Sequence, residues 1–271
     1  MSRLLRRGML GVLLAALFVL GGCSTVPAQG GGSAAQADAA APSSPADPWE
    51  RFNRRVFDFN EAVDTAVLKP VAQAYRAVVP EFVRTGVDNM FGNLGDAWST
   101  VNLVLQAKPK AALEMGMRVA TNTVFGLFGF LDIGEEIGLS KQSEDFGQTL
   151  AVWGVGNGPY VVLPLLGPST LRDTAALPVD MKASPGNLVF KEVRDQNGAT
   201  VLQLISTRSR LLSASKVLDD VALDKYILLR DGYLARRRSQ VYDGDPPDDE
   251  ETKPDEPKAA QAKPAEPKPA K

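Results

Sequence analysis

A run of 26 residues without a charged side chain, from Phe146 to Leu171, constrains the fold more than any other feature of this 271-residue chain. A helix needs about 20 apolar residues to cross a bilayer, so the run is long enough to span one. It also contains five glycines and three prolines, and irregular backbone does not face lipid tails unless its polar groups are paired or line a cavity. We therefore expect tight turns over residues 153–160, and an apolar segment over residues 161–166 that packs against protein or lines an apolar cavity.

A second run without charge covers residues 119–131 and ends in an apolar, glycine-containing segment, residues 124–131. Two interpretations stay open for both runs: they form ordinary buried core, or they lie partly in a membrane. From these runs and one earlier helix we select candidates for contact with lipid or membrane: Phe59, Asn60, Phe125, Leu127, Phe128, Phe130, Leu131, Val161, Leu163, Leu165 and Leu166.

The chain between residues 47 and 242 otherwise carries mostly helical signals. Asp47 is expected to cap the first helix, with Pro48 at its first position and Glu50 in its first turn. Further helices are predicted near 81–92, 94–106, 109–124, 187–195, 199–215 and 218–238. Strand-like alternation is scarce, so the fold class is predicted to be all-α.

Three local features of these helices can be predicted as well. Pro70 and Pro80 are expected to break or restart helices. Glu114 and Arg118 are expected to form an i,i+4 ion pair worth a few tenths of a kcal/mol. Arg236-Arg237-Arg238 ends the last predicted helix, where cations either complement the helix dipole or meet anionic lipid headgroups.

The N-terminus has the organisation of a secretory signal, residues 1–22. Three arginines precede an uncharged run of 15 residues from Gly8 to Gly22, which is too short to span a bilayer. The run ends in Gly22-Cys23, which resembles the lipobox of bacterial lipoproteins, with cleavage after Gly22 and lipidation of Cys23. Ser24 follows, and lipoproteins kept at the inner membrane usually have aspartate there, so the resemblance implies the outer membrane.

Two segments that lack a core pattern flank the helical region. Residues 23–46 are rich in alanine, glycine, serine and proline and are predicted to be a flexible tether. Residues 243–271 contain seven prolines among charged residues and alanines and are predicted to be a disordered tail, either a solvated end or a spacer for weak contacts. The domain is therefore expected to cover residues 47–242.

Composition excludes several function classes. The chain has no histidine and one cysteine, which excludes the Ser-His-Asp and Cys-His mechanisms and the imidazole or multi-cysteine metal sites. A formal net charge of −2 argues against nucleic acid as a partner. The acid pairs at 135–136 and 144–145 fit no calcium loop and are interpreted as solvated, so no metal or cofactor is expected.

Two blocks of sequence resemble the MlaA (VacJ) lipoprotein family. The first covers residues 47–54 and 57–60, beginning Asp47-Pro48-Trp49. The second, central block covers residues 146–150, 158–160 and 163–173, and the C-terminal helices fit as well. The resemblance extends over about residues 47–242, and the central block is its most specific part.

The resemblance implies a compact helical ring in the inner leaflet of the outer membrane, lipid-anchored on the periplasmic side. A channel in such a ring passes phospholipids that have strayed into the outer leaflet to a periplasmic lipid-carrier protein, which maintains lipid asymmetry. The family also associates with trimeric porins. By this analogy the central block forms a mobile hairpin, with hinges at Gly154, Gly156, Gly158 and Pro159.

Two other functions stay open from the residues alone. One is a structural adaptor that only holds porins. The other is an envelope lipid hydrolase, which without histidine needs a Ser-Lys pair. The only sequence neighbours of that kind to consider are Ser140 with Lys141 and Ser215 with Lys216. Transport itself breaks no bond, so a transport protein is not an enzyme and needs no catalytic residue.

Overall fold

The computed structural model describes residues 44–247, which form helices and one antiparallel two-stranded hairpin. The elements are α2 (Glu50–Val63), the π-helical η1 (Asp64–Leu68), α3 (Lys69–Val78), α4 (Glu81–Leu105), α5 (Pro109–Val124), α6 (Ile133–Glu136), α7 (Phe146–Val152), β1 (Tyr160–Leu163), β2 (Gly167–Thr170), α8 (Leu171–Lys182), α9 (Pro185–Val189), α10 (Val193–Val221) and α11 (Lys225–Val241). The residues predicted to form the signal, tether and tail lie outside this range, except for 44–46 and 243–247.

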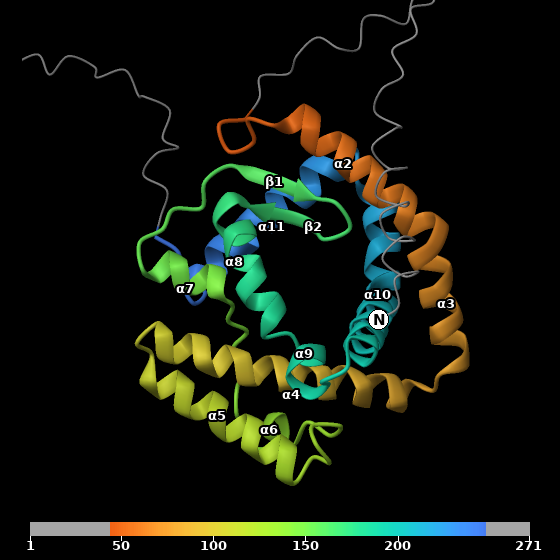
Figure 1. The fold of residues 1–271 in the computed structure, drawn as a ribbon. Coiled ribbons are helices and arrows are strands. Elements are labelled where there is room, and N and C mark those ends of the chain that lie inside the picture. Colours follow the sequence, from red (N-terminus) through yellow and green to blue (C-terminus); the bar gives the residue numbers. More distant parts are fainter. Residues whose placement is uncertain (1–43, 248–271) are drawn as a thin grey trace, which may run out of the picture. The chain divides into compact units, whose positions relative to one another are not determined.

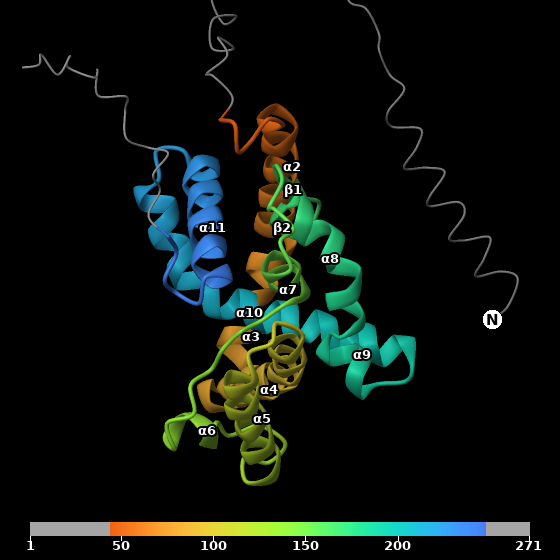
Figure 2. The same ribbon diagram turned by 90° about the vertical axis from the view of Figure 1, so that its left-hand side faces the viewer.

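The described elements are arranged around a ring (Figure 1). Helices α2, α3 and α10 form one side, α4 and α5 form the base, and α7, α8, α11 and the hairpin form the other side. In the perpendicular view, α9 and α11 extend from opposite faces of this ring (Figure 2). The predicted all-α, ring-like domain with a glycine- and proline-rich hairpin is thus confirmed.

Helix α2 continues through η1 into α3 without the break predicted at Pro70. Proline lacks an N–H, and its ring clashes with the carbonyl four residues earlier in a regular α-helix. The five preceding residues in η1 are π-helical, a wider turn that accommodates the proline. The second predicted break is confirmed: Val79 is extended (φ −92°, ψ 121°), as a residue before proline prefers, and α4 begins after Pro80.

Asp47 does not cap α2, contrary to the prediction. The helix begins at Glu50, and Trp49 in the N-cap position makes no side-chain cap hydrogen bond. The Asp47 carboxylate is fully buried instead, and it accepts hydrogen bonds from Asn53 Nδ2 at 2.7 Å and from the Tyr226 hydroxyl. Tertiary partners thus take the oxygen atoms that a cap would use, and they join the start of the domain to α11.

Helix α4 is one helix over 25 residues and not the two predicted, and it packs against α5, α7, α9 and α10. Two of its contacts need particular residues. A Cβ on Gly86 would lie 2.1 Å from the Phe130 ring, so only glycine admits that ring. Asn93 Nδ2 donates to Thr123 Oγ1 of α5 at 2.9 Å.

Arg118 does not pair with Glu114, contrary to the prediction. Its side chain is buried between α4 and α5, where it binds Asp132, lies 3.5 Å from Asp96 and donates to the Leu139 carbonyl at 2.6 Å. The i,i+4 pattern pointed to a surface pair, but the carboxylates of Asp96 and Asp132 and the Leu139 carbonyl hold this cation in a buried site.

The C-terminal segments were correctly predicted to be helices, but the predicted bounds of these helices were wrong. The pattern predicted at 187–195 covers α9 and the start of α10, and α10 runs past its predicted end to Val221. Asp224 then caps α11 by accepting from the Ile227 N–H at 3.1 Å, so the last boundary lies at residue 224 and not 218.

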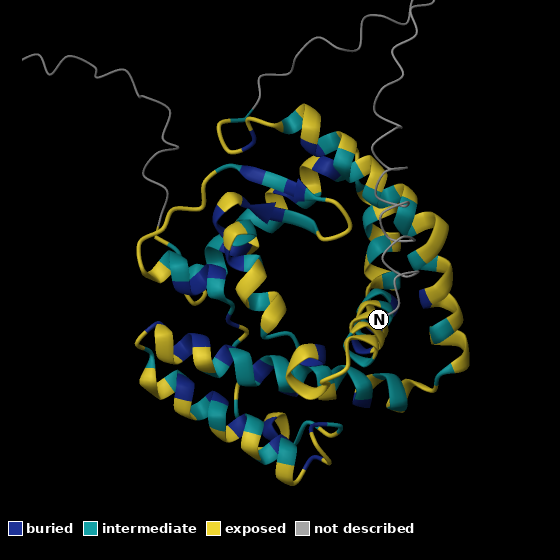
Figure 3. Cartoon of the chain, in the orientation of Figure 1, coloured by how far each residue is buried: buried dark blue, intermediate teal, exposed yellow. Residues whose placement is uncertain are grey.

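The apolar core of the described residues is small. One cluster joins α4 to α5 through Leu103, Ala112 and Met115. Another joins the hairpin to α11 through Tyr160, Val162 and Tyr226, with the Phe57 ring edge-on to Tyr226 at 5.6 Å. Figure 3 shows exposed positions in every long helix and in the hairpin turn. No helix within residues 44–247 has the length and hydropathy that a membrane span needs.

Candidate functional site

Residues 124–131, the apolar loop, display large apolar side chains to solvent after α5. Phe125 and Phe128 are 72% and 77% exposed, and Val124, Leu127 and Leu131 are exposed as well. Leu127 and Phe128 adopt positive φ angles of 53° and 59°, which non-glycine residues rarely do. A soluble surface seldom gathers so many apolar groups, so this surface is suited to contact with lipid or another protein.

The apolar loop pairs part of its own backbone. The Phe128, Gly129 and Leu131 N–H groups donate to the carbonyls of Thr123, Asn122 and Gly126 at 3.1, 2.9 and 2.8 Å. Irregular backbone is tolerated near hydrocarbon only when its polar groups are paired. These three hydrogen bonds therefore reduce the number of polar groups that the loop would carry unpaired into an apolar environment.

Phe130 differs from its neighbours, because it holds the apolar loop to α4. Its ring lies against Gly86 and edge-on to Phe82, with ring centres 6.5 Å apart. Its carbonyl accepts from Asn89 Nδ2 at 3.2 Å. The structure thus makes Phe130 an internal support, and the lipid-contact candidates in this loop are the exposed residues around it.

Asn53 of α2 holds one end of the free edge of β1. Its Nδ2 donates to the Tyr160 carbonyl at 3.1 Å, and its Oδ1 accepts from the Val162 N–H at 2.9 Å. The Tyr160 N–H donates to the Ala46 carbonyl at 2.9 Å, so the start of the domain lies on the same edge. Burial raises the pKa of the Tyr160 phenol to about 12, and Asp47 adds to the effect.

Asn60, one of the predicted site residues, holds the other end of β1 and the hairpin turn. Its Nδ2 donates to the Leu163 carbonyl at 3.0 Å, and its Oδ1 accepts from the Leu165 N–H at 2.7 Å. Leu165 has a φ of 64° and is exposed, as is Leu166 beside it. A helix side chain thus takes the place of a third strand and fixes a turn that shows two leucines.

The other predicted positions in this region are divided between surface and interior. Phe59 is exposed beside Asn60, and Val161 and Leu163 are half-buried on the face of β1 opposite the buried Tyr160 and Val162. The structure brings Asn60, Leu163, Leu165 and Leu166 together in one place. The apolar loop follows α5 at the base of the ring, apart from them (Figure 1).

The predicted hinge residues connect α7 to β1. Gly154 and Gly158 have positive φ angles of 92° and 64°, which supports the predicted tight turns. The segment is tied to the start of α8, where the Leu171 N–H donates to the Pro159 carbonyl at 3.0 Å. An added Cβ would touch nothing within 4 Å at Gly154 or Gly156, so these two glycines lie in open space.

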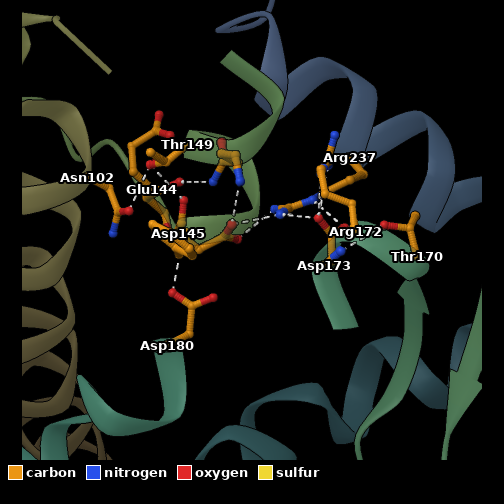
Figure 4. A network of polar contacts seen from close by, with 12 residues as sticks. Asn102, Glu144, Asp145, Thr149, Thr170, Arg172, Asp173, Asp180 and Arg237 are labelled. Atoms are coloured by element: carbon orange, nitrogen blue, oxygen red, sulfur yellow. Dashed lines mark hydrogen bonds and ion pairs between the residues drawn. The ribbon is translucent and has the colours of Figure 1, made fainter. Parts of the chain in front are cut away.

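Arg237 of α11 joins α7 to α8 at the centre of a polar network (Figure 4). Its guanidinium binds Asp145 at 2.6 and 2.7 Å and Asp173 at 2.8 and 2.9 Å. Tyr233 donates to Asp173 at 3.0 Å. Gly147 leaves room for this, since a Cβ there would lie 2.5 Å from Arg237 Nη2.

Charge compensation makes this network stable. Burial alone would raise the pKa of Asp173, but Arg237 and Arg172 outweigh it and hold that pKa below its ordinary value. Burial also raises the pKa of the Tyr233 phenol, and the neighbouring Asp173 adds to that shift. Asp173 is therefore a carboxylate at neutral pH, held between two arginines.

A second group of polar contacts joins α7 to α4 and α8 (Figure 4). Asp180 accepts from Trp98 Nε1 at 2.8 Å and from the Phe146 N–H at 2.9 Å, and burial raises its pKa. Glu144 is buried and accepts from Gln106 Nε2 at 2.9 Å. Interpreting residues 144–145 as solvated loop acids was thus wrong, whereas Glu135 and Glu136 are exposed.

Sequence reasoning missed Asn53 and the network around Arg237. Asn53 and Asn60 lie seven residues apart, on one face of a helix, and that spacing was the available signal. The three successive arginines gave no signal that distinguishes them. Arg237 is buried between two carboxylates, and Arg238 binds the Pro247 carbonyl. The three arginines therefore do not share one role, either as cations that complement the helix dipole or as ligands of lipid headgroups.

The Ser-Lys pairs required by a hydrolase do not form within residues 44–247. Lys141 pairs with Asp96 at 2.9 Å, and the Ser215 hydroxyl donates to the Leu212 carbonyl and accepts from Arg208. The same described range contains no group of three or more acidic or cysteine side chains that could hold a metal ion.

We expect Asn60→Ala to release the hairpin turn. Loss of the hydrogen bond to the Leu165 N–H should lower the free energy that protects this amide by about 1 kcal/mol, which raises its hydrogen-exchange rate about fivefold. Hydrogen exchange at Leu165 measures this. Asn53→Ala is the matched control, because it acts on the Val162 amide directly. Unchanged exchange at Leu165 in Asn60→Ala would show that this side chain does not hold the turn.

The MlaA lipoprotein family model matches residues 45–240. The Escherichia coli (strain K12) protein named intermembrane phospholipid transport system lipoprotein MlaA is 36% identical over 194 residues, covering 70% of this chain and 76% of that protein. The Haemophilus influenzae protein of the same name is 31% identical over 223 residues, covering 78% and 85%. A chain solved in work on the structural basis for maintenance of bacterial outer membrane lipid asymmetry aligns with a TM-score of 0.63 and 34% identity, over 73% of this chain and 99% of that one.

Proposed function

The chain belongs to the MlaA lipoprotein family, and on this premise we propose that it moves phospholipids from the outer leaflet of the outer membrane toward the periplasm and so maintains lipid asymmetry. The relatives carry phospholipid transport in their names, and the aligned structure comes from work on outer membrane lipid asymmetry. The family match covers nearly all the described residues.

The apolar loop is the structural observation that carries this proposal. Removing a phospholipid from a bilayer exposes on the order of 30 CH₂ groups, or about 24 kcal/mol at 0.8 kcal/mol each. A protein lowers that barrier by offering apolar surface to the tails. Exposed side chains on a loop with a partly paired backbone provide such surface, and the leucines of the hairpin turn provide more.

The remaining features of the family are proposed for this chain from the resemblance. Lipidation at Cys23, after cleavage at Gly22, anchors the domain to the periplasmic side of the outer membrane. The partners are a trimeric porin and a periplasmic lipid-carrier protein. The hinge glycines let the hairpin move beside the path of the lipid. No bond of the lipid is broken, so the chain is not an enzyme.

We expect Phe128→Asp to weaken membrane contact without unfolding the domain. Burying a phenylalanine contributes about 1.5–3 kcal/mol, so its loss should lower vesicle binding at least tenfold. Cosedimentation with phosphatidylethanolamine–phosphatidylglycerol vesicles measures this, in a Cys23→Ala background that removes the anchor. Leu223→Asp changes another exposed apolar side chain, between α10 and α11, and should bind as the parent does. Equal binding of both variants would contradict membrane contact by this loop.

Mass spectrometry of lipid carried by the full-length purified protein tests the proposed function. Transport predicts that intact phospholipid co-purifies, and that added phospholipid is recovered unchanged after incubation. Lysophospholipid or free fatty acid formed in proportion to protein would instead establish a hydrolase. Recovery of no lipid, with porin still bound, would favour the structural adaptor.

A further inference from the structure

A polar cavity of about 630 Å³ lies between α4, α10, α11 and the segment before α7. Amide and hydroxyl groups of Asn89, Gln203 and Thr207 contribute to its wall. Three cations, Lys141, Arg210 and Arg236, also line it. This cavity borders the apolar loop, because Asn89 of its wall also donates to the Phe130 carbonyl at 3.2 Å. No residue of the hairpin lines it, and its lining is suited to a polar, charged ligand.

The acids in the cavity wall are already engaged. Asp132 binds Arg118 and accepts from Asn122 Nδ2 at 3.0 Å. Asp96 pairs with Lys141 at 2.9 Å. Glu144, the third of these acids, accepts from Gln106, and burial raises its pKa. These three carboxylates therefore leave little negative charge to repel an anion.

The two arginines are the available cations. Arg210 has only a long contact, 3.8 Å, with Asp88, the fourth acid of the wall. Arg236 has no ion pair or hydrogen bond with any other described residue. They come from different helices, α10 and α11, and converge on one cavity. Planar guanidinium groups with free N–H donors are the usual partners of phosphate oxygens.

We propose that this cavity binds the phosphate of a glycerophospholipid headgroup, with Arg236 and Arg210 as its ligands. The inference rests on the proposed transport function and specifies where the polar end of the lipid is held. An apolar surface accommodates the tails, but it offers no partner to the phosphate, which is hydrated at the membrane surface and loses that hydration inside the protein. A polar cavity with two available guanidinium groups replaces that hydration.

A ³¹P NMR titration of the detergent-solubilised full chain with sn-glycero-3-phosphoethanolamine tests the site. We expect saturable binding, weakened at least tenfold in Arg236→Gln, because a hydrogen bond to a charged group is lost. Arg194→Gln removes an exposed arginine outside the cavity and should bind as wild type does. Equal affinity of wild type and Arg236→Gln would overturn the proposal.

Two further measurements distinguish a headgroup site from a site for free phosphate, and this inference from the proposed function. Inorganic phosphate should bind more weakly than the glycerol ester, and equal affinity would assign the cavity to a free anion. Outer-leaflet lipid, measured in cells, separates this inference from the proposed function. If wild type clears surface phospholipid and Arg236→Gln clears it equally, then the headgroup site is wrong and transport stands. If wild type clears none, then transport itself is wrong.

Discussion

Arg237→Met is expected to lower the free energy of unfolding by about 3 kcal/mol, because it leaves Asp145 and Asp173 without their shared cation. Removing one partner of a buried ion pair costs more than the pair contributes, since the remaining charge stays desolvated. Urea unfolding of the detergent-solubilised full chain, followed by circular dichroism, measures the change. Three helices, α7, α8 and α11, meet at this arginine, so we expect a cooperative effect.

The neighbouring residue supplies a matched control for this change. Arg236→Met alters an exposed arginine on the same helix and should shift the free energy by no more than about 0.5 kcal/mol. Equal, small effects of both substitutions would show that the network does not hold the domain together.

The same variant should alter the response to acid. Asp173 has a folded pKa below its ordinary value, so it contributes stability above its unfolded pKa, near 4, and loses it as pH falls through the folded pKa. Without Arg237, the effect of burial on Asp173 is less compensated, so the pKa of Asp173 in the folded state rises toward its value in the unfolded state. The loss of stability on acidification should therefore be smaller in Arg237→Met than in wild type.

Cys23→Ala is expected to abolish outer-membrane attachment and transport. Each buried CH₂ of an acyl chain contributes about 0.8 kcal/mol, and stable anchoring takes more than one chain. Without the acyl chains, the apolar loop offers only a few exposed side chains for attachment to the membrane. Density-gradient fractionation and the mass of the N-terminal peptide measure attachment and acylation.

A neighbouring substitution controls for changes near the cleavage site. Ser24→Ala keeps the thiol and should stay acylated and in the outer-membrane fraction. If Cys23→Ala remained there as firmly as wild type, the anchor would not be the main attachment.

Features set by local chemistry were predictable from the sequence. Pro109 begins α5 as predicted, because proline suits the first turn of a helix and its effect depends on no distant residue. Pro80 separates α3 from α4 for a similar local reason. The central run without charge also turns where its glycines permit positive φ angles, at Gly154 and Gly158.

Features set by distant partners were not predictable. The glycines of α4 favour a break in isolation, but the Phe130 ring occupies the space beside Gly86, and four other helices pack against α4. Aspartate is a common N-cap residue, yet Asn53 and Tyr226 bind the Asp47 carboxylate.

The consecutive arginines at the end of α11 show the same limit for the site. They are identical in type and point to three environments: the polar cavity, a pair of carboxylates and a backbone carbonyl. No pattern in one helix identifies partners contributed by α7, α8 and α10. The apolar loop was the opposite case, because its composition alone marked it as a candidate.

Outer-leaflet phospholipid in living cells tests the central claim most directly. Phosphatidylethanolamine at the cell surface is labelled with a membrane-impermeant amine reagent, in a strain that lacks this chain and in the same strain supplied with it. Restored wild-type protein should lower the surface-labelled fraction, and Phe128→Asp at equal outer-membrane abundance should not. A surface fraction that does not change when correctly located wild-type protein is supplied would contradict phospholipid transport by this chain.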